Sequence, residues 1–177
     1  MHPIRHFCTI TRHRHRVIVH CFRAGIGWQG LFHDLSKYSP REFWVGARYY
    51  QGTHSPNETE RRTLGYSTAW LHHKGRNRHH FEYWTDYHPV EHRVMPVKMP
   101  VNYVAEMFCD RLAASKIYQG KDYDRQHPLS YFLAGKPRRV IHPETSALLE
   151  GWLTLVAQQG EQAAFAAIRR QLKEKTY

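Results

Sequence analysis

Hydrophobic side chains recur at helical spacing in the N-terminal part of the chain. Over residues 4–24, the apolar residues Phe7, Ile10, Val17 and Cys21 follow one another at intervals of three, seven and four, and basic or other polar residues occupy most positions between them. These intervals place the four side chains on one face of an α-helix. Gly25 follows the periodic stretch, and glycine commonly ends a helix. The pattern therefore predicts a helix over residues 4–24.

Two Ser-Pro pairs indicate where further helices begin. Segments 39–42 (Ser-Pro-Arg-Glu) and 55–58 (Ser-Pro-Asn-Glu) each have a glutamate three positions after the serine. This is the pattern of a capping box with proline at the first helical position. The pairs predict helices over residues 39–50 and 55–73, the second of them ended by Gly75.

The remaining periodic segments complete an all-helical prediction. Further helices are expected at residues 30–37, 79–87, 101–119, 143–159 and 161–173. The alternation of polar and apolar residues that is typical of strands is missing apart from ambiguous fragments. The chain has 177 residues and neither an internal repeat nor a linker, so we expect one domain, residues 1–177. The fold class is predicted to be all-α, with about six to eight helices.

The composition indicates the cellular compartment and the kind of binding partner to expect. No run of about 18 apolar residues is present, and no apolar segment follows the basic N-terminus, so neither a membrane span nor a secretory signal is expected. Three cysteines without a CxxC motif indicate reduced thiols and a cytoplasmic location. The formal net charge of +11 favours an anionic partner, either a small molecule or nucleic acid. The alternative is a basic surface in contact with solvent only.

Histidine is the residue type that changes the picture most. The chain contains fifteen histidines, and most of them are bunched along the sequence. The bunches contain His13, His15 and His20; His33; His72, His73, His79 and His80; and His88 and His92. Imidazole is the commonest protein ligand for transition metals. The clustering therefore makes a bound divalent metal ion a serious candidate.

The sharpest motif is the His33-Asp34 doublet, which is followed by Lys37. With His13 before it and Asp110 in an otherwise apolar segment after it, the doublet resembles the HD-domain superfamily of metal-dependent phosphohydrolases. That family uses one histidine, a later His-Asp doublet and a much later aspartate. The resemblance covers residues 6–120 and implies an HD-domain-like helical bundle, with residues 121–177 forming C-terminal helices outside the metal-binding core.

The two histidine pairs resemble an extension that some HD-domain proteins use to hold a second metal ion. They are His72-His73 and His79-His80, and they suggest a bacterial and phage branch of the superfamily with a double His-His element. Because neighbours on a helix point in different directions, His73 is favoured over His72 as a ligand. The implied metal ligands are His13, His33, Asp34, His73, His79, His80 and Asp110. Asp34 would bind one ion or bridge two.

Several positions keep an alternative interpretation. His15 and His20 compete with His13 for the first ligand place, and Asp110 could instead pair with an arginine such as Arg111. Glu82 is expected to hydrogen-bond a liganding imidazole.

Four cations are candidates for binding phosphate oxygens. They are Lys37, Lys74, Arg76 and Arg78. The alternative for the last three is a basic loop that binds nothing.

The resemblance implies hydrolysis of a phosphate ester, such as a nucleotide, with one or two divalent ions of Mn, Fe, Zn, Co or Ni. Asp34 and Lys37 would act directly in the reaction, and Glu82 would support it. A second hypothesis keeps the site but makes it a di-iron oxygenase of the HD type. A third is a basic nucleic-acid-binding protein with a structural metal, whose binding would depend strongly on salt.

Overall fold

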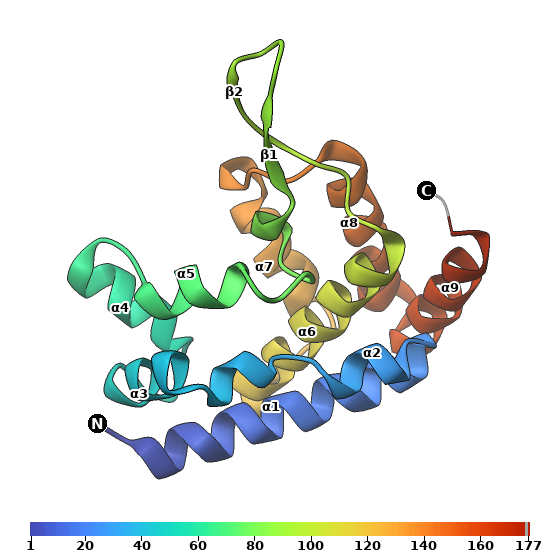
Figure 1. The fold of residues 1–177 in the computed structure, drawn as a ribbon. Coiled ribbons are helices and arrows are strands. Elements are labelled where there is room, and N and C mark those ends of the chain that lie inside the picture. Colours follow the sequence, from blue (N-terminus) through green and yellow to red (C-terminus); the bar gives the residue numbers. More distant parts are fainter. Residues whose placement is uncertain (176) are drawn as a thin grey trace.

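The computed structural model describes residues 1–175 and 177, and this part of the chain is predominantly all-α, as predicted (Figure 1). The α-helices of the described residues are α1 (Pro3–Ala24), α2 (Gly27–Leu31), α3 (Pro40–Arg48), α4 (Pro56–Leu64), α5 (Thr68–Lys74), α6 (Val101–Gln119), α7 (His127–Gly135), α8 (Pro143–Gln159) and α9 (Glu161–Glu174). Short 3₁₀ helices are η1 (Leu35–Tyr38), η2 (Phe81–Tyr83), η3 (Gly120–Asp122) and η4 (Lys136–Arg138).

The long helix α1 carries histidines on its buried face. It ends before Gly25, as predicted, and Gly25 adopts a left-handed conformation (φ 88°). The side chains of His6, His13 and His20 are buried at intervals of seven residues, so they lie on one face together with apolar residues such as Val17. The helix therefore presents imidazoles to the interior.

Helix α6 runs through the middle of the molecule (Figure 1). It packs on α1, α7, α8 and α9, and its length matches the predicted segment 101–119. Phe108 on α6 forms edge-to-face contacts with Trp152 of α8 (6.2 Å between ring centres) and Phe165 of α9 (5.7 Å). Such aromatic contacts add to the stabilisation from burial. The C-terminal helices thus complete the core beside α6.

Of the two helices predicted from the Ser-Pro pairs, the one over residues 39–50 is shorter in the structure and ends at Arg48, and the one over residues 55–73 is broken. The segment 55–73 divides into α4 and α5 at Gly65, which has a φ of 81°. Glu60 stabilises the break, because its carboxylate accepts hydrogen bonds from the hydroxyl groups of Ser67 (2.5 Å) and Thr68 (2.6 Å). The hydroxyl of Ser67 in turn accepts from the backbone N–H of Trp70 and caps α5. No capping hydrogen bond from the side chain of either predicted serine cap is formed in α3 or α4 of the described chain.

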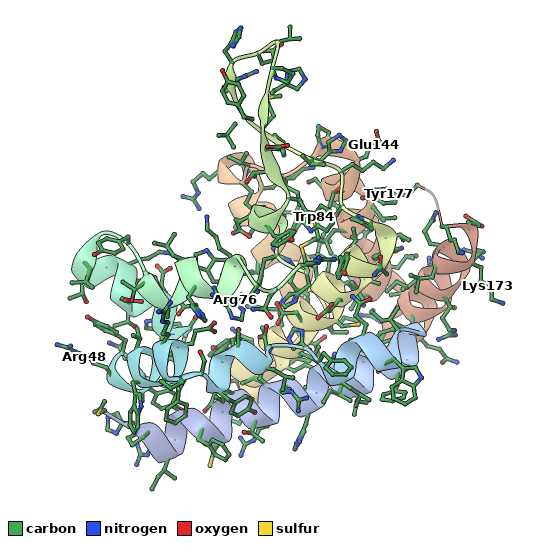
Figure 2. The ribbon with its side chains drawn as sticks, in the orientation of Figure 1. Arg48, Arg76, Trp84, Glu144, Lys173 and Tyr177 are labelled. Carbon is green, nitrogen blue, oxygen red and sulfur yellow. The ribbon has the colours of Figure 1, made fainter. Side chains whose placement is uncertain are left out.

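The predicted helix 79–87 is not formed, because this segment contains only the 3₁₀ helix η2 and the start of a small antiparallel hairpin. Strands β1 (Thr85–His88) and β2 (Arg93–Pro96) pair in the register Thr85↔Pro96 and His88↔Arg93, and the hairpin projects away from the helices (Figure 1). Trp84 lies at its base (Figure 2) and donates to the carbonyl oxygen of Arg78 (2.7 Å). The prediction missed the hairpin because its strands are only four residues long and do not alternate clearly. Helix α7 was also missed.

Within the described residues, none of the helices combines the length and the apolar character that crossing a bilayer requires.

Candidate metal centre

Seven side chains that the sequence singles out meet in one place, which we call the histidine–aspartate cluster. They come from α1, from the turn between α2 and η1, from α5, from the segment before η2 and from α6. The members are His13, His33, Asp34, His73, His79, His80 and Asp110. Residues almost one hundred positions apart in the chain are therefore neighbours in space.

The cluster divides into two groups that share Asp34. One group consists of His13, His33, Asp34 and Asp110; the other consists of Asp34, His73, His79 and His80. In each group the candidate ligand atoms lie within 4.8 Å of one another. Two donor atoms bound at about 2.1 Å from one ion are at most about 4.2 Å apart, so a small contraction would fit an ion. Each buried group could hold a metal ion.

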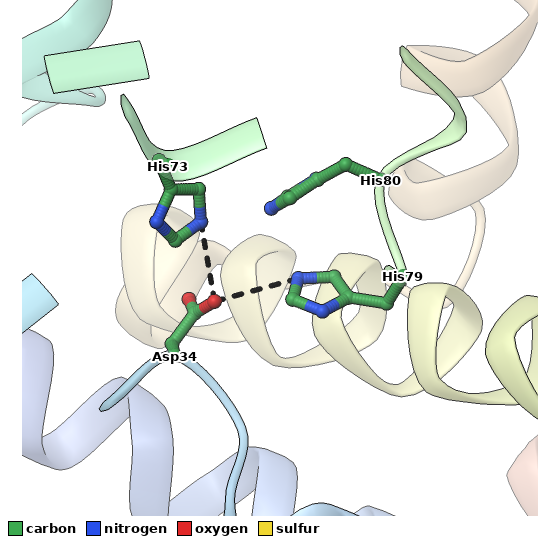
Figure 3. A group of neighbouring side chains, drawn as sticks. All are labelled: Asp34, His73, His79 and His80. Carbon is green, nitrogen blue, oxygen red and sulfur yellow. Dashed lines mark ion pairs between the residues drawn. The ribbon is translucent and has the colours of Figure 1, made fainter. Parts of the chain in front are cut away.

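The two carboxylate oxygens of Asp34 face different groups. Oδ1 lies 3.2 Å from Nε2 of His73 and 3.5 Å from Nε2 of His79 (Figure 3). Oδ2 lies 3.3 Å from Nε2 of His33. In the first group, Nε2 of His13 is 2.9 Å from Oδ1 of Asp110. A carboxylate placed in this way can serve both groups at once.

A turn, and not a helix, brings His33 and Asp34 to the same side. Asp34 has a left-handed backbone conformation (φ 53°, ψ 26°), which aspartate adopts more readily than most non-glycine residues. Arg14 of α1 holds the turn by donating to the carbonyl oxygens of His33 (3.1 Å) and Leu31. The prediction of one helix over residues 30–37 was wrong. The interruption lets two adjacent side chains face one centre, which successive residues of a helix, about 100° apart, do less easily.

Glu106 on α6 orients one histidine of each group. Its Oε1 lies 2.9 Å from Nδ1 of His33 and 3.2 Å from Nδ1 of His79, so both rings direct Nε2 toward Asp34. Gln29 donates to the other oxygen of Glu106 (2.5 Å). Burial by itself raises the pKa of Glu106, but the contacts with the two histidines lower it to about 2. Sequence reasoning missed Glu106, although an acid one helical turn before Asp110 in an apolar helix was a usable signal.

Glu42 on α3 plays the same part for His73. Its Oε2 lies 2.7 Å from Nδ1 of His73, and its Oε1 lies 2.6 Å from Nδ1 of His72. The sequence suggested that Glu42 belongs to a capping box, whereas its side chain is buried against these imidazoles. The two neighbouring histidines nevertheless differ in position: His73 belongs to the second group of the cluster, whereas His72 belongs to neither group.

Buried polar atoms without hydrogen bonds mark where an ion would fit. In the described residues these atoms include Nε2 of His13, His33, His73, His79 and His80 and both carboxylate oxygens of Asp34. Leaving such atoms buried without a partner costs free energy. Such atoms also occur elsewhere in the described residues, but these seven lie together in the two groups. A metal ion accepts lone pairs from imidazole nitrogens and carboxylate oxygens together. The donor set therefore fits a divalent transition metal.

The charges within the cluster are strongly coupled. Burial lowers the pKa of His33, but the carboxylates of Asp34, Glu106 and Asp110 outweigh it and raise the value to about 10. Burial raises the pKa of Asp34, yet His33, Lys37 and His73 hold it well below its usual range. Without an ion, protonated His33 and His73 and the ammonium group of Lys37 thus neutralise the acids. A bound cation would replace those protons, because ligands must be deprotonated to bind metal.

The cations that were predicted to bind phosphate oxygens have different contacts in the structure. Lys37 lies in the site, with Nζ 2.6 Å from Oδ2 of Asp34. Arg76 instead donates to the carbonyl oxygen of His72 (3.2 Å), and Arg78 donates to the hydroxyl of Tyr103 (3.3 Å).

Lys74 and Glu82 are also not seen to bond to the cluster. No ion pair of Lys74 is found in the described part of the chain. Glu82 makes no hydrogen bond to a cluster imidazole among the described residues; its Oε2 is buried without a hydrogen-bond partner, and burial raises its pKa. The contacts with cluster imidazoles that were predicted for Glu82 are instead made by Glu42 and Glu106.

The two rivals of His13 on α1 lie elsewhere. His15 is exposed, and His20 is buried with its Nδ1 3.3 Å from the carbonyl oxygen of Cys109. Neither is a member of the two groups. Asp110 contacts His13 and lies 3.8 Å from Nε2 of His33, and no ion pair with Arg111 is formed in the described residues.

Comparison with known proteins gives one family match. A sequence model described as "Family of unknown function (DUF5662)" matches residues 2–155, a range that contains every residue of the cluster. No curated protein and no solved structure matches the chain.

Proposed function

The chain belongs to DUF5662, a family of unknown function, and from the geometry of its cluster we propose that it is an HD-type metal-dependent hydrolase of a phosphate ester. The observation that carries the proposal is the position of Asp34 between two groups of metal-ligating side chains. In this proposal His13, His33, Asp34 and Asp110 hold one ion, and Asp34, His73, His79 and His80 hold the second.

The protein groups around the ions have separate tasks. Glu106 and Glu42 keep imidazole rings oriented through their Nδ1 atoms, which is how protein groups beyond the ligands usually tune a metal site. Lys37, whose partly exposed side chain pairs with the buried Asp34, could attract a phosphate oxygen. Burial of the cluster excludes bulk water and strengthens these charge interactions.

When bound, divalent ions lower the pKa of a water molecule and polarise a phosphoryl group. In the overall reaction, one water and one phosphate ester give phosphate and an alcohol. A new P–O bond forms from water while the P–O bond to the alcohol oxygen breaks. The leaving oxygen keeps the bonding electron pair and receives a proton that originates from water.

The test is phosphate release by protein purified without chelators, after elemental analysis of its metal content. Mn, Co, Ni, Zn, Fe and Mg are added in turn to a panel of nucleotides and sugar phosphates. We expect turnover with at least one metal, and its loss in Asp34→Asn. The matched control is His15→Ala, which removes an exposed histidine of the same helix as His13. Absence of turnover with every metal would contradict the proposal.

A second candidate, a di-iron oxygenase of the HD type, is favoured by the ligand composition. The cluster combines five histidines with two aspartates, a set of imidazoles and carboxylates that suits iron as well as zinc or manganese. Iron content and an electron paramagnetic resonance spectrum of the purified protein separate the two candidates. Zinc alone in the protein would exclude the oxygenase.

A further inference from the structure

Two arginines from different elements meet at one aromatic ring. Arg111 directly follows Asp110 on α6, and Arg139 lies directly after η4. The guanidinium carbon of Arg111 is 5.8 Å from the centre of the Phe132 ring, and that of Arg139 is 5.2 Å from the same centre. Burial, and after it the positive charge of Arg139, lower the pKa of Arg111. The two guanidinium groups are therefore near enough to repel each other.

The position of Arg139 is fixed by the backbone of α7. Its Nη1 donates to the carbonyl oxygen of Phe132 (2.6 Å). Its guanidinium also lies against Gly135, where an added Cβ would come within 2.3 Å of Nη2. Glycine thus leaves the room that the guanidinium occupies, and Arg139 is held in place before any ligand arrives. Pre-organised donors of this kind bind ligands at a lower entropic cost.

Neither arginine forms an ion pair with an acid of the described chain, although Glu82 is close enough to both arginines, and Asp110 to Arg111, to offset part of their charge. No salt bridge joins Arg111 or Arg139 to a carboxylate in residues 1–175 or 177, and Nε of Arg111 is buried without a hydrogen-bond partner. Lys37, by contrast, has Asp34 within 2.6 Å. Two like charges held together are unfavourable when nearby acids offset them only in part. An anion between them would reduce this cost.

We propose that Arg111 and Arg139 bind the terminal phosphate of a phosphate monoester. The inference rests on the proposed function and names its substrate class. A guanidinium group donates two parallel hydrogen bonds to phosphate oxygens. A monoester offers three free oxygens and about two negative charges, which suits two guanidinium groups, whereas a diester offers two oxygens and one charge.

The position of Arg111 on α6 connects this site with the histidine–aspartate cluster. Arg111 directly follows Asp110, which contacts His13 and His33. The two side chains project about 100° apart on the helix, yet the carboxylate of Asp110 is near enough to offset part of the lowering of the pKa of Arg111 that burial causes. A phosphate held by Arg111 would therefore lie near the first group of the cluster, on the neighbouring face of α6. These two arginines take the place of Lys74, Arg76 and Arg78, which the sequence suggested for phosphate.

The experiment measures binding of three probes by isothermal titration calorimetry: inorganic phosphate, methyl phosphate and dimethyl phosphate. It uses the full chain both as purified and after chelation. We expect phosphate and methyl phosphate to bind at least about tenfold more tightly than dimethyl phosphate. Arg111→Gln and Arg139→Gln should each weaken methyl phosphate binding by about tenfold or more. Gly135→Ala, which displaces Arg139 without a change of charge, should weaken it too.

Arg138→Gln is the matched control, because Arg138 is the exposed neighbour of Arg139 and donates only to the carbonyl oxygen of Ala134 (3.3 Å). Its affinity for methyl phosphate should stay within about twofold of the wild type. Thermal unfolding and metal content verify that each variant is folded and loaded like the wild type. Equal affinity in wild type, Arg111→Gln and Arg139→Gln would overturn the inference.

The same data separate the two proposals. If metal-loaded protein hydrolyses a monoester and both arginine variants keep its KM, the hydrolase stands and the phosphate site is wrong. If the protein hydrolyses nothing but its affinity for methyl phosphate still depends on both arginines, the phosphate site stands and the hydrolase is wrong.

Discussion

The carboxylate of Glu106 lies 2.9 Å from Nδ1 of His33 and thereby points Nε2 of that ring toward Asp34. The same oxygen contacts His79, which belongs to the other group. One carboxylate therefore orients a ligand of each group. This arrangement makes the two candidate metal positions depend on a residue that belongs to neither.

Replacing Glu106 by glutamine should weaken both positions together. An amide lacks the negative charge that stabilises the two imidazoles, and loss of such a partner typically lowers metal affinity about 10- to 100-fold. Competition of a chromophoric chelator for Zn²⁺ or Mn²⁺ measures the affinity. Glu58→Gln is the control, since Glu58 is a partly exposed acid whose ion pairs among the described residues are with Arg61 and Arg62 of α4. A variant that loses one ion and keeps the other at full affinity would contradict this coupling.

Removing metal should lower the melting temperature. Ligands that bind only the folded state stabilise it by about 4 kcal/mol when present at a thousand times their dissociation constant. The protein with and without a chelator is compared by calorimetry, and a fall of several degrees is expected. Asp34→Asn removes the carboxylate that both groups share, so its melting temperature should not respond to the chelator. A chelator effect of equal size in this variant would argue against the shared site.

The long helices were predictable because their apolar residues repeat and their ends carry proline or glycine. The predicted segments 101–119 and 143–159 coincide with α6 and α8. The members of the histidine–aspartate cluster were also proposed from the sequence, although their role as ligands remains a prediction. Spaced histidines and an acid in a largely apolar helix are local signals, and a family resemblance supplied the pairing between them.

The features that the sequence did not predict depend on tertiary contacts, which the pattern of residues along the chain does not show. The position of Glu42 after Ser39 predicted a capping box, but its carboxylate contacts the imidazole rings of His72 and His73 on α5. The turn at Asp34 is stabilised by Arg14 from α1. Arg139 was not singled out, because its position depends on Gly135 and on the ring of Phe132. Tertiary partners decide the conformation in each case.

Acid should destabilise the protein through His20. Burial, and after it the charge of Lys116, lower the pKa of His20 to about 4, against 6.5 for the unfolded chain. Between these values the unfolded state binds more protons, so stability rises with pH and is lost as the pH falls from 6.5 toward 4. In chelated protein, urea unfolding at several pH values should show a smaller acid loss for His20→Gln. His15→Gln, at an exposed position, is the control. An unchanged slope in His20→Gln would contradict the assignment.

Glycine-to-alanine exchanges should have opposite effects at two helical positions. At Gly30 of α2, an added Cβ would lie 2.4 Å from Cβ of Cys21, so α2 must move away from α1. Overpacking of this kind costs about 1–3 kcal/mol, and the shift would displace the turn that carries His33 and Asp34. Gly30→Ala should therefore lose stability and metal affinity together.

At Gly151 of α8 the added Cβ meets no atom within 4 Å, and alanine favours the helix by about 0.5–1 kcal/mol. Gly151→Ala should raise the free energy of unfolding and leave metal affinity unchanged, because α8 contributes no residue to the cluster. Urea denaturation and chelator competition on both variants measure the pair. If Gly30→Ala unfolds more easily yet binds metal as tightly as the wild type, the contact between α1 and α2 supports the fold but does not set the geometry of the His33-Asp34 turn.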